Sequence, residues 1–420
     1  MIHISNLRKE SADGWTKLIV DITYGGGGYN CLVEPNIWIA VKDEYAYMLS
    51  DDVYDAFVLV PLYIGMSYNE DIHIHGCVSK KLYKNVMTYL QKILCDFSDK
   101  LSRIDIHVDG FKTADGEPEI IGTGISCGID SFTTIYDHYA NEDDPDYRIN
   151  TLFFHNCGSH GGYGEKSKQL FFDRYALNKP AADELGLPIY LIDSNLHAFE
   201  RNVGHYQNIG YFARFSCIIG LQRAIKKYYM ASAYSYEEIK RFSSNTSLAE
   251  FSESYAVPLM CTEKLEFVID GCQYTRSQKT EHIADWEIAQ KYMNVCTDAS
   301  AEGHNCSKCG KCMRTLLALE ALGKLNNFAG VFDIETYKKH SFANKCDIVL
   351  HKGRDAFSYD NYKFALTHGM RMPLYLTAWV YLLPRQLYLL PRRLFSLTKK
   401  AVRKIIGQKL YNALKKKIKG

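Results

Sequence analysis

Short apolar runs alternate with helix-like stretches from about residue 116 onward. We expect strands at 120–125, 149–154 and 189–192, and helices from Ser131 and around 211–227. Repeated strand–helix–strand units predict an α/β fold, in which a doubly wound parallel sheet carries helices on both faces. Ligands of such sheets bind at the carboxyl ends of the strands, so the first strand-to-helix junction is the place to look for a site.

The chain has 420 residues, more than a single core usually accommodates, so several domains are expected. Early in the chain, alternating strands at 72–75 and 104–108 flank a helix that Ser79 can cap. The predicted parts are an N-terminal α+β module (1–115), the α/β domain (116–330), a helical extension (331–370) and a basic tail (371–420).

The tail differs in charge from the rest of the chain. Residues 371–420 contain thirteen Lys or Arg and no acidic residue, which leaves 37 basic against 48 acidic residues elsewhere. Apolar residues step by four through its last part, as in an interfacial amphipathic helix: Val402, Ile406, Leu410, Leu414 and Ile418. The apolar run 374–383 is about half as long as a membrane-spanning helix requires. The tail therefore predicts a partner of its own, either a membrane surface or nucleic acid.

Thirteen cysteines, an odd number, and a start without a charged and apolar leader favour a reducing cytoplasm over a secreted disulfide framework. Aromatic residues accompany the charges of the tail, and they favour a peripheral contact with the inner face of the membrane over nucleic acid. These aromatic residues are Trp379, Tyr381, Tyr388 and Phe395. The sequence leaves a homodimer open.

Residues 122–132, Gly-Thr-Gly-Ile-Ser-Cys-Gly-Ile-Asp-Ser-Phe, follow the first of these strands. They contain G-x-S-x-G, the pattern of an α/β-hydrolase elbow with Ser126 as nucleophile, but the partners, Asp193 with His282 or His304, are an arbitrary choice. A dinucleotide loop would need a glycine where Cys127 stands, and no Gly-Lys-Ser/Thr is present for a Walker loop.

An anion-binding loop uses more of these residues. Ser126, Gly128, Asp130 and Ser131 lie between a strand and a helix start, where hydroxyls and backbone N–H groups can surround a phosphate. Gly128 permits the unusual backbone conformation that such a loop requires and a close approach of the backbone to the phosphate. The carboxylate of Asp130 repels phosphate, so it is expected to cap the helix or to contact Mg²⁺.

Four cysteines form a cluster with C-x9-C-x2-C-x2-C spacing: Cys296, Cys306, Cys309 and Cys312. Four thiolates at such spacing can close a tetrahedral structural zinc site, and an iron–sulfur cluster is the alternative. His304 can replace one ligand. A structural zinc contributes about 10–16 kcal/mol of apparent binding free energy to folding.

The hexapeptide at 126–131 resembles the S-G-G-x-D-S signature of the PP-loop ATP pyrophosphatases, with Cys127 in place of the first glycine. Together with the cysteines, the segment Pro258-Leu259, Lys264, Glu266, Val268 and Gly271 resembles the zinc-bearing 7-cyano-7-deazaguanine synthase branch of that superfamily. The resemblance covers about residues 116–330 and implies a Rossmann-like fold of the HUP or PP-loop type.

The resemblance also implies an activity, which is ATP cleavage to AMP and pyrophosphate with adenylation of a carboxylate or amide oxygen, followed by nitrogen transfer. It places ATP against Ser126, Cys127, Gly128, Ile129, Asp130, Ser131 and His155. It makes Asp130 and Lys264 the catalytic residues, with Mg²⁺ beside the nucleotide. Arg276 and Lys279 can face the substrate or pyrophosphate.

The chain departs from that branch in its length, its N-terminal module and its tail, so a different substrate is expected. We expect an unidentified small-molecule or glycan-linked carboxylate, for instance in surface-polysaccharide assembly. A tRNA-modifying PP-loop enzyme is the alternative, in which the tail would bind phosphates.

Overall fold

The structure is a computed structural model that describes the 420-residue chain except residues 26–33, 161–162, 201–205, 243–247, 299–302 and 384–420. The chain divides into two compact units, residues 1–334 and 335–420. The larger unit contains the sheet and both sites described below.

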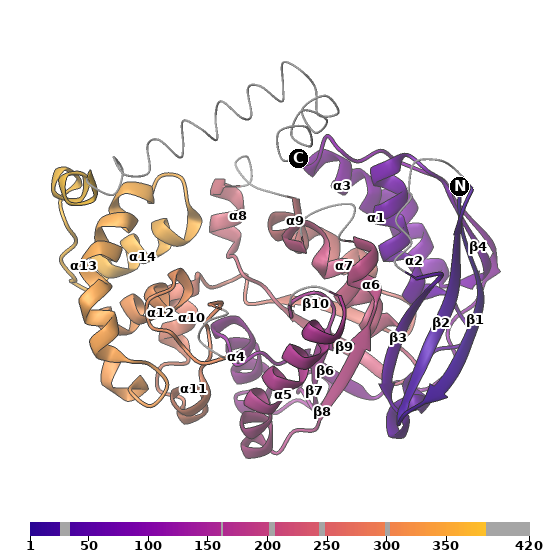
Figure 1. Ribbon diagram of the computed structural model, residues 1–420, viewed down its shortest axis with the longest axis horizontal. Helices are drawn as coiled ribbons and strands as arrows, with labels where there is room; N and C mark the ends of the chain where they lie inside the picture. Colours follow the sequence, from indigo (N-terminus) through magenta and orange to yellow (C-terminus); the bar gives the residue numbers. More distant parts are fainter. Residues whose placement is uncertain (26–33, 161–162, 201–205, 243–247, 299–302, 384–420) are drawn as a thin grey trace, which may run out of the picture. The chain divides into compact units, whose positions relative to one another are not determined.

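Ten strands form one mixed sheet in the first unit, in the order β10-β9-β6-β7-β8-β3-β2-β1-β4-β5 (Figure 1). The strands are β1 (Ile2–Ala12), β2 (Trp15–Tyr24), β3 (Asn36–Lys42), β4 (Ile72–Val78), β5 (Ile106–Phe111), β6 (Ile120–Gly124), β7 (Thr151–Asn156), β8 (Ile189–Ser194), β9 (Ile225–Ala231) and β10 (Glu266–Asp270). The predicted α/β class is confirmed, and the sheet is mostly parallel.

Five consecutive strands form the parallel half of the sheet. Numbered along the chain from β6, they lie in the order 5-4-1-2-3, and every neighbouring pair is parallel. The strand order therefore reverses between β6 and β9, which is the position where doubly wound sheets bind ligands. On the far side, β3 pairs antiparallel with β8 and joins the amino-terminal strands to this half.

The α-helices are α1 (Leu59–Tyr68), α2 (Lys80–Asn85), α3 (Gln91–Phe97), α4 (Ile129–Ile135), α5 (Glu165–Leu185), α6 (Leu196–Glu200), α7 (Tyr206–Ile219), α8 (Tyr236–Phe242), α9 (Leu248–Ala256), α10 (Arg276–His282), α11 (Glu287–Tyr292), α12 (Gly310–Ala321), α13 (Ile334–His351) and α14 (Ala356–Thr367). A further helical segment covers residues 375–383. Helix α7 packs against α1, α6 and α9, whereas α4 packs against α10, and α10 against α12. Right-handed crossovers place α4 and α5 on one face and α7 on the other.

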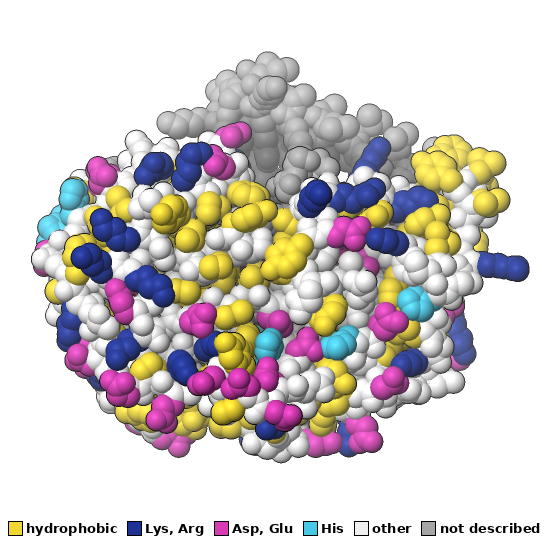
Figure 2. Space-filling model, turned by 180° about the vertical axis from the view of Figure 1, so that it is seen from behind, with side chains coloured by type: hydrophobic (Ala, Val, Ile, Leu, Met, Phe, Trp, Pro, Cys, Tyr) yellow, Lys and Arg dark blue, Asp and Glu magenta, His cyan; other side chains and the backbone are white. Residues whose placement is uncertain are grey.

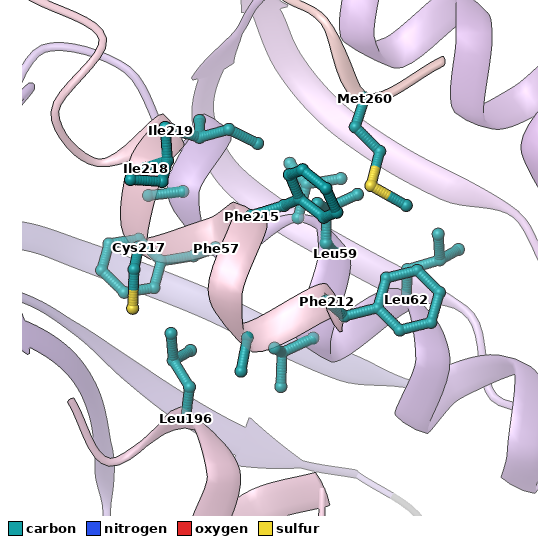
Figure 3. Packing of buried hydrophobic residues seen from close by; sticks show 14 of the residues in the cluster. Phe57, Leu59, Leu62, Leu196, Phe212, Phe215, Cys217, Ile218, Ile219 and Met260 are labelled. Atoms are coloured by element: carbon teal, nitrogen blue, oxygen red, sulfur yellow. The ribbon is translucent and has the colours of Figure 1, made fainter. Parts of the chain in front are cut away.

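The main core combines the amino-terminal part with the parallel half. Figure 3 shows Phe212 and Phe215 of α7 beside Leu59 and Leu62 of α1, and all four side chains are fully buried. The predicted boundary at residue 115 therefore falls inside one sheet and one core. The antiparallel pairing of β3 with β8 explains this, because it extends one sheet across both segments.

Two local expectations are corrected. The helix expected around 211–227 ends at Ile219, and β9 already begins at Ile225. Ser79 precedes α2 but does not cap it through its side chain. Instead, its backbone N–H and hydroxyl both donate to the buried carboxylate of Asp55, which also accepts from Gln222 Nε2 at 2.9 Å. Burial raises the pKa of Asp55 to about 6.

The second unit contains α13, α14 and a small apolar cluster of Cys346, Val349, Ala378 and Leu382. Among the described residues, no helix is both long and apolar enough to cross a membrane. The predicted amphipathic helix at 402–418 lies outside the described residues.

Candidate functional site

The loop of residues 125–131, called the 125–131 loop below, lies at the carboxyl end of β6, beside the point where the strand order reverses. Its last residues form the first turn of α4, which begins at Ile129. Ile129 is fully buried and anchors that turn. The predicted strand-to-helix junction is thus present, and the free N–H groups of a helix start face the ligand-binding edge of the sheet.

Two serine hydroxyls lie together in the 125–131 loop. Ser126 is exposed, and its Oγ lies 3.0 Å from Oγ of Ser131 and 3.4 Å from the backbone N of Gly128. Ser131 also donates to the carbonyl of Gly128 at 3.2 Å. These contacts close the loop on itself, so hydroxyls and N–H groups are collected within one turn of chain.

The backbone at Cys127, rather than at Gly128, has the left-handed conformation. Cys127 has φ +53°, while Gly128 has φ −83°, which any residue adopts. The Cys127 side chain is 1% exposed and therefore points into the protein, and burial raises the pKa of its thiol. The expectation that Gly128 supplies the unusual backbone conformation is corrected, and the thiol lies away from the exposed side of the loop.

Asp130 binds two cationic side chains from the start of α10. Its Oδ2 accepts from Arg276 Nη1 at 2.8 Å, and its Oδ1 lies 3.4 Å from Lys279 Nζ. Arg276 and Lys279 are 8% and 1% exposed. Burial by itself raises the pKa of Asp130, but Arg276, Lys279 and Lys311 outweigh it and hold that pKa below its usual value.

The positive charges exceed the negative charge at this position. Lys311, in the first turn of α12, is near enough to interact with both Asp130 and Arg276, and burial together with Arg276 lowers the pKa of Lys311. Three cations thus surround one carboxylate, where the starts of α4, α10 and α12 meet. An excess of positive charge that is partly shielded from water favours an anion carrying several charges.

A glycine gives Lys279 access to the carboxyl ends of the strands. Gly271 follows β10 with φ +79°, and a Cβ there would lie 3.0 Å from both Cε and Nζ of Lys279. Past Gly271, the Nζ of Lys279 donates a hydrogen bond to the carbonyl of Ser232, which follows β9. A larger residue at 271 would strain the backbone and press against the end of the Lys279 side chain.

Lys264 lies elsewhere. It precedes β10 and pairs with Glu117, which precedes β6, at an Nζ–Oε1 distance of 3.5 Å. Both strands run parallel, so this pair lies at their amino ends, and the 125–131 loop lies at the opposite edge. The predicted catalytic role of Lys264 is therefore not supported by its position.

His155 lies inside the sheet, near the carboxyl end of β7. It is 8% exposed, and its Nε2 has no hydrogen-bond partner among the described residues. Burial, with smaller effects of Arg214 and His160, lowers the pKa of His155 to about 3, so the ring is neutral. A neutral buried ring can pack against a nucleobase, but the described contacts do not connect it to Asp130.

The four cysteines lie close enough to hold one metal ion. Their sulfurs are within 4.8 Å of one another, with Cys296 Sγ 3.8 Å from Cys309 Sγ, and Cys309 Sγ 3.5 Å from Cys312 Sγ. Tetrahedral zinc with bonds of about 2.3 Å separates its sulfurs by about 3.8 Å, so the spacing fits zinc. His304 is not part of this group.

Backbone donors around the cluster favour thiolates. Cys309 N donates to Cys306 Sγ at 3.2 Å, and Cys306 N donates to Cys296 Sγ at 3.5 Å. Burial opposes ionisation of Cys309, but N–H groups of Cys312 and Thr297 lower the pKa of Cys309 to about 6, whereas burial raises the pKa of Cys296 and of Cys312. A metal ligand must be deprotonated, so the donors make Cys309 the thiol most ready to bind a metal ion.

The cysteine cluster and the 125–131 loop are physically connected. Asn294, two residues before Cys296, donates its backbone N–H to the carbonyl of Cys127 at 2.7 Å. At its other end, the cluster contains the start of α12, where Lys311 lies between Cys309 and Cys312. A metal ion there would fix both the loop and one of the three cations.

The described residues give Ser126 no histidine base. Its hydroxyl bonds only within its own loop, while His282 bonds Asp137 and Asp193 bonds Asn156. The nominated triad is therefore not assembled, and an acyl-transfer role for Ser126 is not supported.

Sequence reasoning named Arg276 and Lys279 without assigning them a partner, and it missed Lys311. A signal was present, since Lys311 lies between two metal-ligand cysteines at a helix start, where its position is fixed. Comparison of the chain with protein-family models, with curated proteins and with solved structures found no match.

Proposed function

We propose that the chain is an ATP-dependent adenylating enzyme of the PP-loop type, which cleaves ATP to AMP and pyrophosphate. The observation that carries this proposal is the placement of Arg276, Lys279 and Lys311 around Asp130 at the start of α4. Pyrophosphate carries several negative charges, and this arrangement offers it cations, hydroxyls and helix N–H groups at one end of a doubly wound sheet.

In this proposal, a carboxylate or amide oxygen of the acceptor attacks the α-phosphorus of MgATP. The bond from that phosphorus to the bridging oxygen breaks, and the pyrophosphate leaves with both electrons. Arg276, Lys279 and the N–H groups of the 125–131 loop stabilise the charge that develops on it. A nitrogen nucleophile then displaces AMP from the acceptor.

Asp130 has a positioning role in this proposal. Its carboxylate holds two cations that would otherwise repel each other, and it keeps Lys279 directed toward the carboxyl ends of the strands. Asp130 offsets part of the free-energy cost of burying these two charges. Their orientation is thus set before the nucleotide arrives.

The protein incubated with MgATP and pooled small metabolites should release AMP and pyrophosphate in equal amounts. Asp130→Asn should lower the turnover by about a hundredfold, since the electrostatic placement of leaving-group donors has effects of that size. Lys264→Gln should leave turnover unchanged, because Lys264 lies at the opposite edge of the sheet.

Release of ADP and phosphate, or full turnover in Asp130→Asn, would overturn the proposal. Loss of turnover in Lys264→Gln, with the fold retained by circular dichroism, would restore the catalytic role predicted from the sequence.

We further propose a peripheral membrane contact through residues 371–420. Part of this segment is described, and it exposes large apolar side chains: Leu374, Tyr375, Leu376, Trp379, Val380 and Tyr381. Figure 2 shows a gathering of hydrophobic side chains at its upper right, in the second unit. Next to thirteen basic residues, such a surface suits an anionic bilayer.

Deletion of residues 371–420 should abolish co-sedimentation with vesicles that contain phosphatidylserine and spare ATP cleavage. Unchanged co-sedimentation would eliminate the tail as an anchor. Steeply salt-dependent RNA binding by the full chain, without vesicle binding, would instead support the nucleic-acid alternative.

A further inference from the structure

A cluster of three histidines lies on the amino-terminal strands of the sheet, outside the site described above. His3 of β1 and His73 of β4 are register partners in a parallel pair, and His75 lies two residues further along β4. Residues two apart in a strand face the same side of a sheet, so the three imidazoles share one face. Histidine side chains are visible together at the left edge of Figure 2.

The face with the histidines is the one that the helices leave uncovered. Ile2, Ile4, Ile72 and Ile74 alternate with the histidines and are buried in the main core on the other side. His3 and His73 are half-buried and His75 is exposed. The backbone of two paired strands therefore holds the rings in place, while one side remains open to solvent.

The ring nitrogens are close enough to bind one ion. His3 Nδ1 lies 3.1 Å from His75 Nε2, and one nitrogen from each of the three rings lies within 4.8 Å of the others. Among the described residues, only this group and the four cysteines meet that condition.

A carboxylate lies beside the three rings. Asp109 of β5 places a carboxylate 3.3 Å from Nε2 of His73. A carboxylate beside a histidine is the usual companion of a metal-bound imidazole, because it orients the ring and adds negative charge.

We propose that His3, His73 and His75 bind one divalent transition-metal ion of the zinc, nickel and copper class. Imidazole ligands suit these ions, and calcium or magnesium would require oxygen ligands instead. Three protein ligands leave the remaining coordination positions to water. The histidine site is therefore open, whereas the four cysteines would fill all the positions around a zinc ion. The proposal of a histidine site does not depend on the proposed ATP-cleaving function.

The test uses full-length protein without an affinity tag, in the Cys309→Ser background and with the remaining accessible thiols alkylated, so that these thiols neither bind nor reduce Cu²⁺. Titration with Cu²⁺ alone should show one equivalent bound, with nitrogen hyperfine coupling in the electron paramagnetic resonance spectrum. His75→Ala should weaken binding by at least about tenfold and change that coupling. His75 is exposed, so the variant is expected to fold.

His107→Gln is the matched control. His107 lies opposite His73 on β5, with ring centroids 6.1 Å apart, yet it is not part of the group of three. This variant should bind Cu²⁺ as the unsubstituted chain does. Equal binding by His75→Ala, or no bound equivalent in the Cys309→Ser background while the fold is retained, would overturn the proposal. If Cys309→Ser fails to fold, the same titration is made on protein whose cysteine site is filled with zinc. One equivalent of Cu²⁺ should then bind to that protein, and His75→Ala should lack this equivalent.

Discussion

Replacement of Arg276 by glutamine should weaken the binding of magnesium pyrophosphate by roughly 10- to 100-fold. Hydrogen bonds to charged groups contribute about 1.5–3 kcal/mol each. Without the Arg276 guanidinium, the negative charge of Asp130 is also less well neutralised, so it repels the pyrophosphate more strongly. Arg276 is 8% exposed and lies 2.8 Å from the carboxylate of Asp130. Isothermal titration of the purified protein with pyrophosphate and Mg²⁺ measures the change directly.

Lys226→Gln provides the matched control for Arg276→Gln. Lys226 also forms an ion pair, 2.8 Å from Asp146, but it is exposed at the amino end of β9. Its replacement should change the affinity by less than about twofold, because exposed ion pairs contribute little. Equal affinity in Arg276→Gln and the unsubstituted chain would show that pyrophosphate binds elsewhere.

Substitution of Cys309 by serine should release the metal ion and weaken the candidate anion site at the same time. The purified protein should contain about one zinc per chain, and Cys309→Ser should retain clearly less after dialysis against a chelator, because the ion loses one of its four thiolate ligands. Zinc binding of this type contributes about 10–16 kcal/mol of apparent free energy to folding, so a large fall in thermal stability is expected.

The loss of pyrophosphate affinity in Cys309→Ser follows from two contacts. Asn294 holds the carbonyl of Cys127 at 2.7 Å, and the turn that contains Cys309 and Cys312 positions Lys311. Titration below the unfolding temperature separates this effect from global unfolding. Cys77→Ser, outside the cluster, should leave both zinc content and affinity unchanged. Iron in place of zinc would identify the alternative cluster, and unaltered zinc in Cys309→Ser would contradict the site.

The local parts of the fold could be predicted from the sequence. The junction of β6 with α4 follows from the apolar run and the helix pattern, and the cysteines meet because their spacing is short. The pairing of Ile39 with Ser194 could not be predicted, since strands 155 residues apart carry no local signal of their partnership. The continuity of the sheet past residue 115 depends on that pairing.

Only the residues of the candidate site that are adjacent in sequence could be predicted. Ser126 to Ser131 are adjacent in sequence, whereas Arg276 and Lys279 reach Asp130 only through the packing of α10 on α4. Lys264 lies away from the 125–131 loop, and the sequence contained a signal for this. A residue just before a parallel strand lies at the opposite edge of the sheet from a loop that follows such a strand.

The antiparallel contact between β3 and β8 also has a consequence for cooperativity. The first 115 residues cover one edge of the parallel half and supply much of its core, so the two segments are expected to unfold together. A chain that began at residue 116 would expose β8 as an unpaired edge strand and leave the apolar side of α7 uncovered. Both are surfaces on which protein chains aggregate. The amino-terminal strands thus protect the parallel half of the sheet from such aggregation.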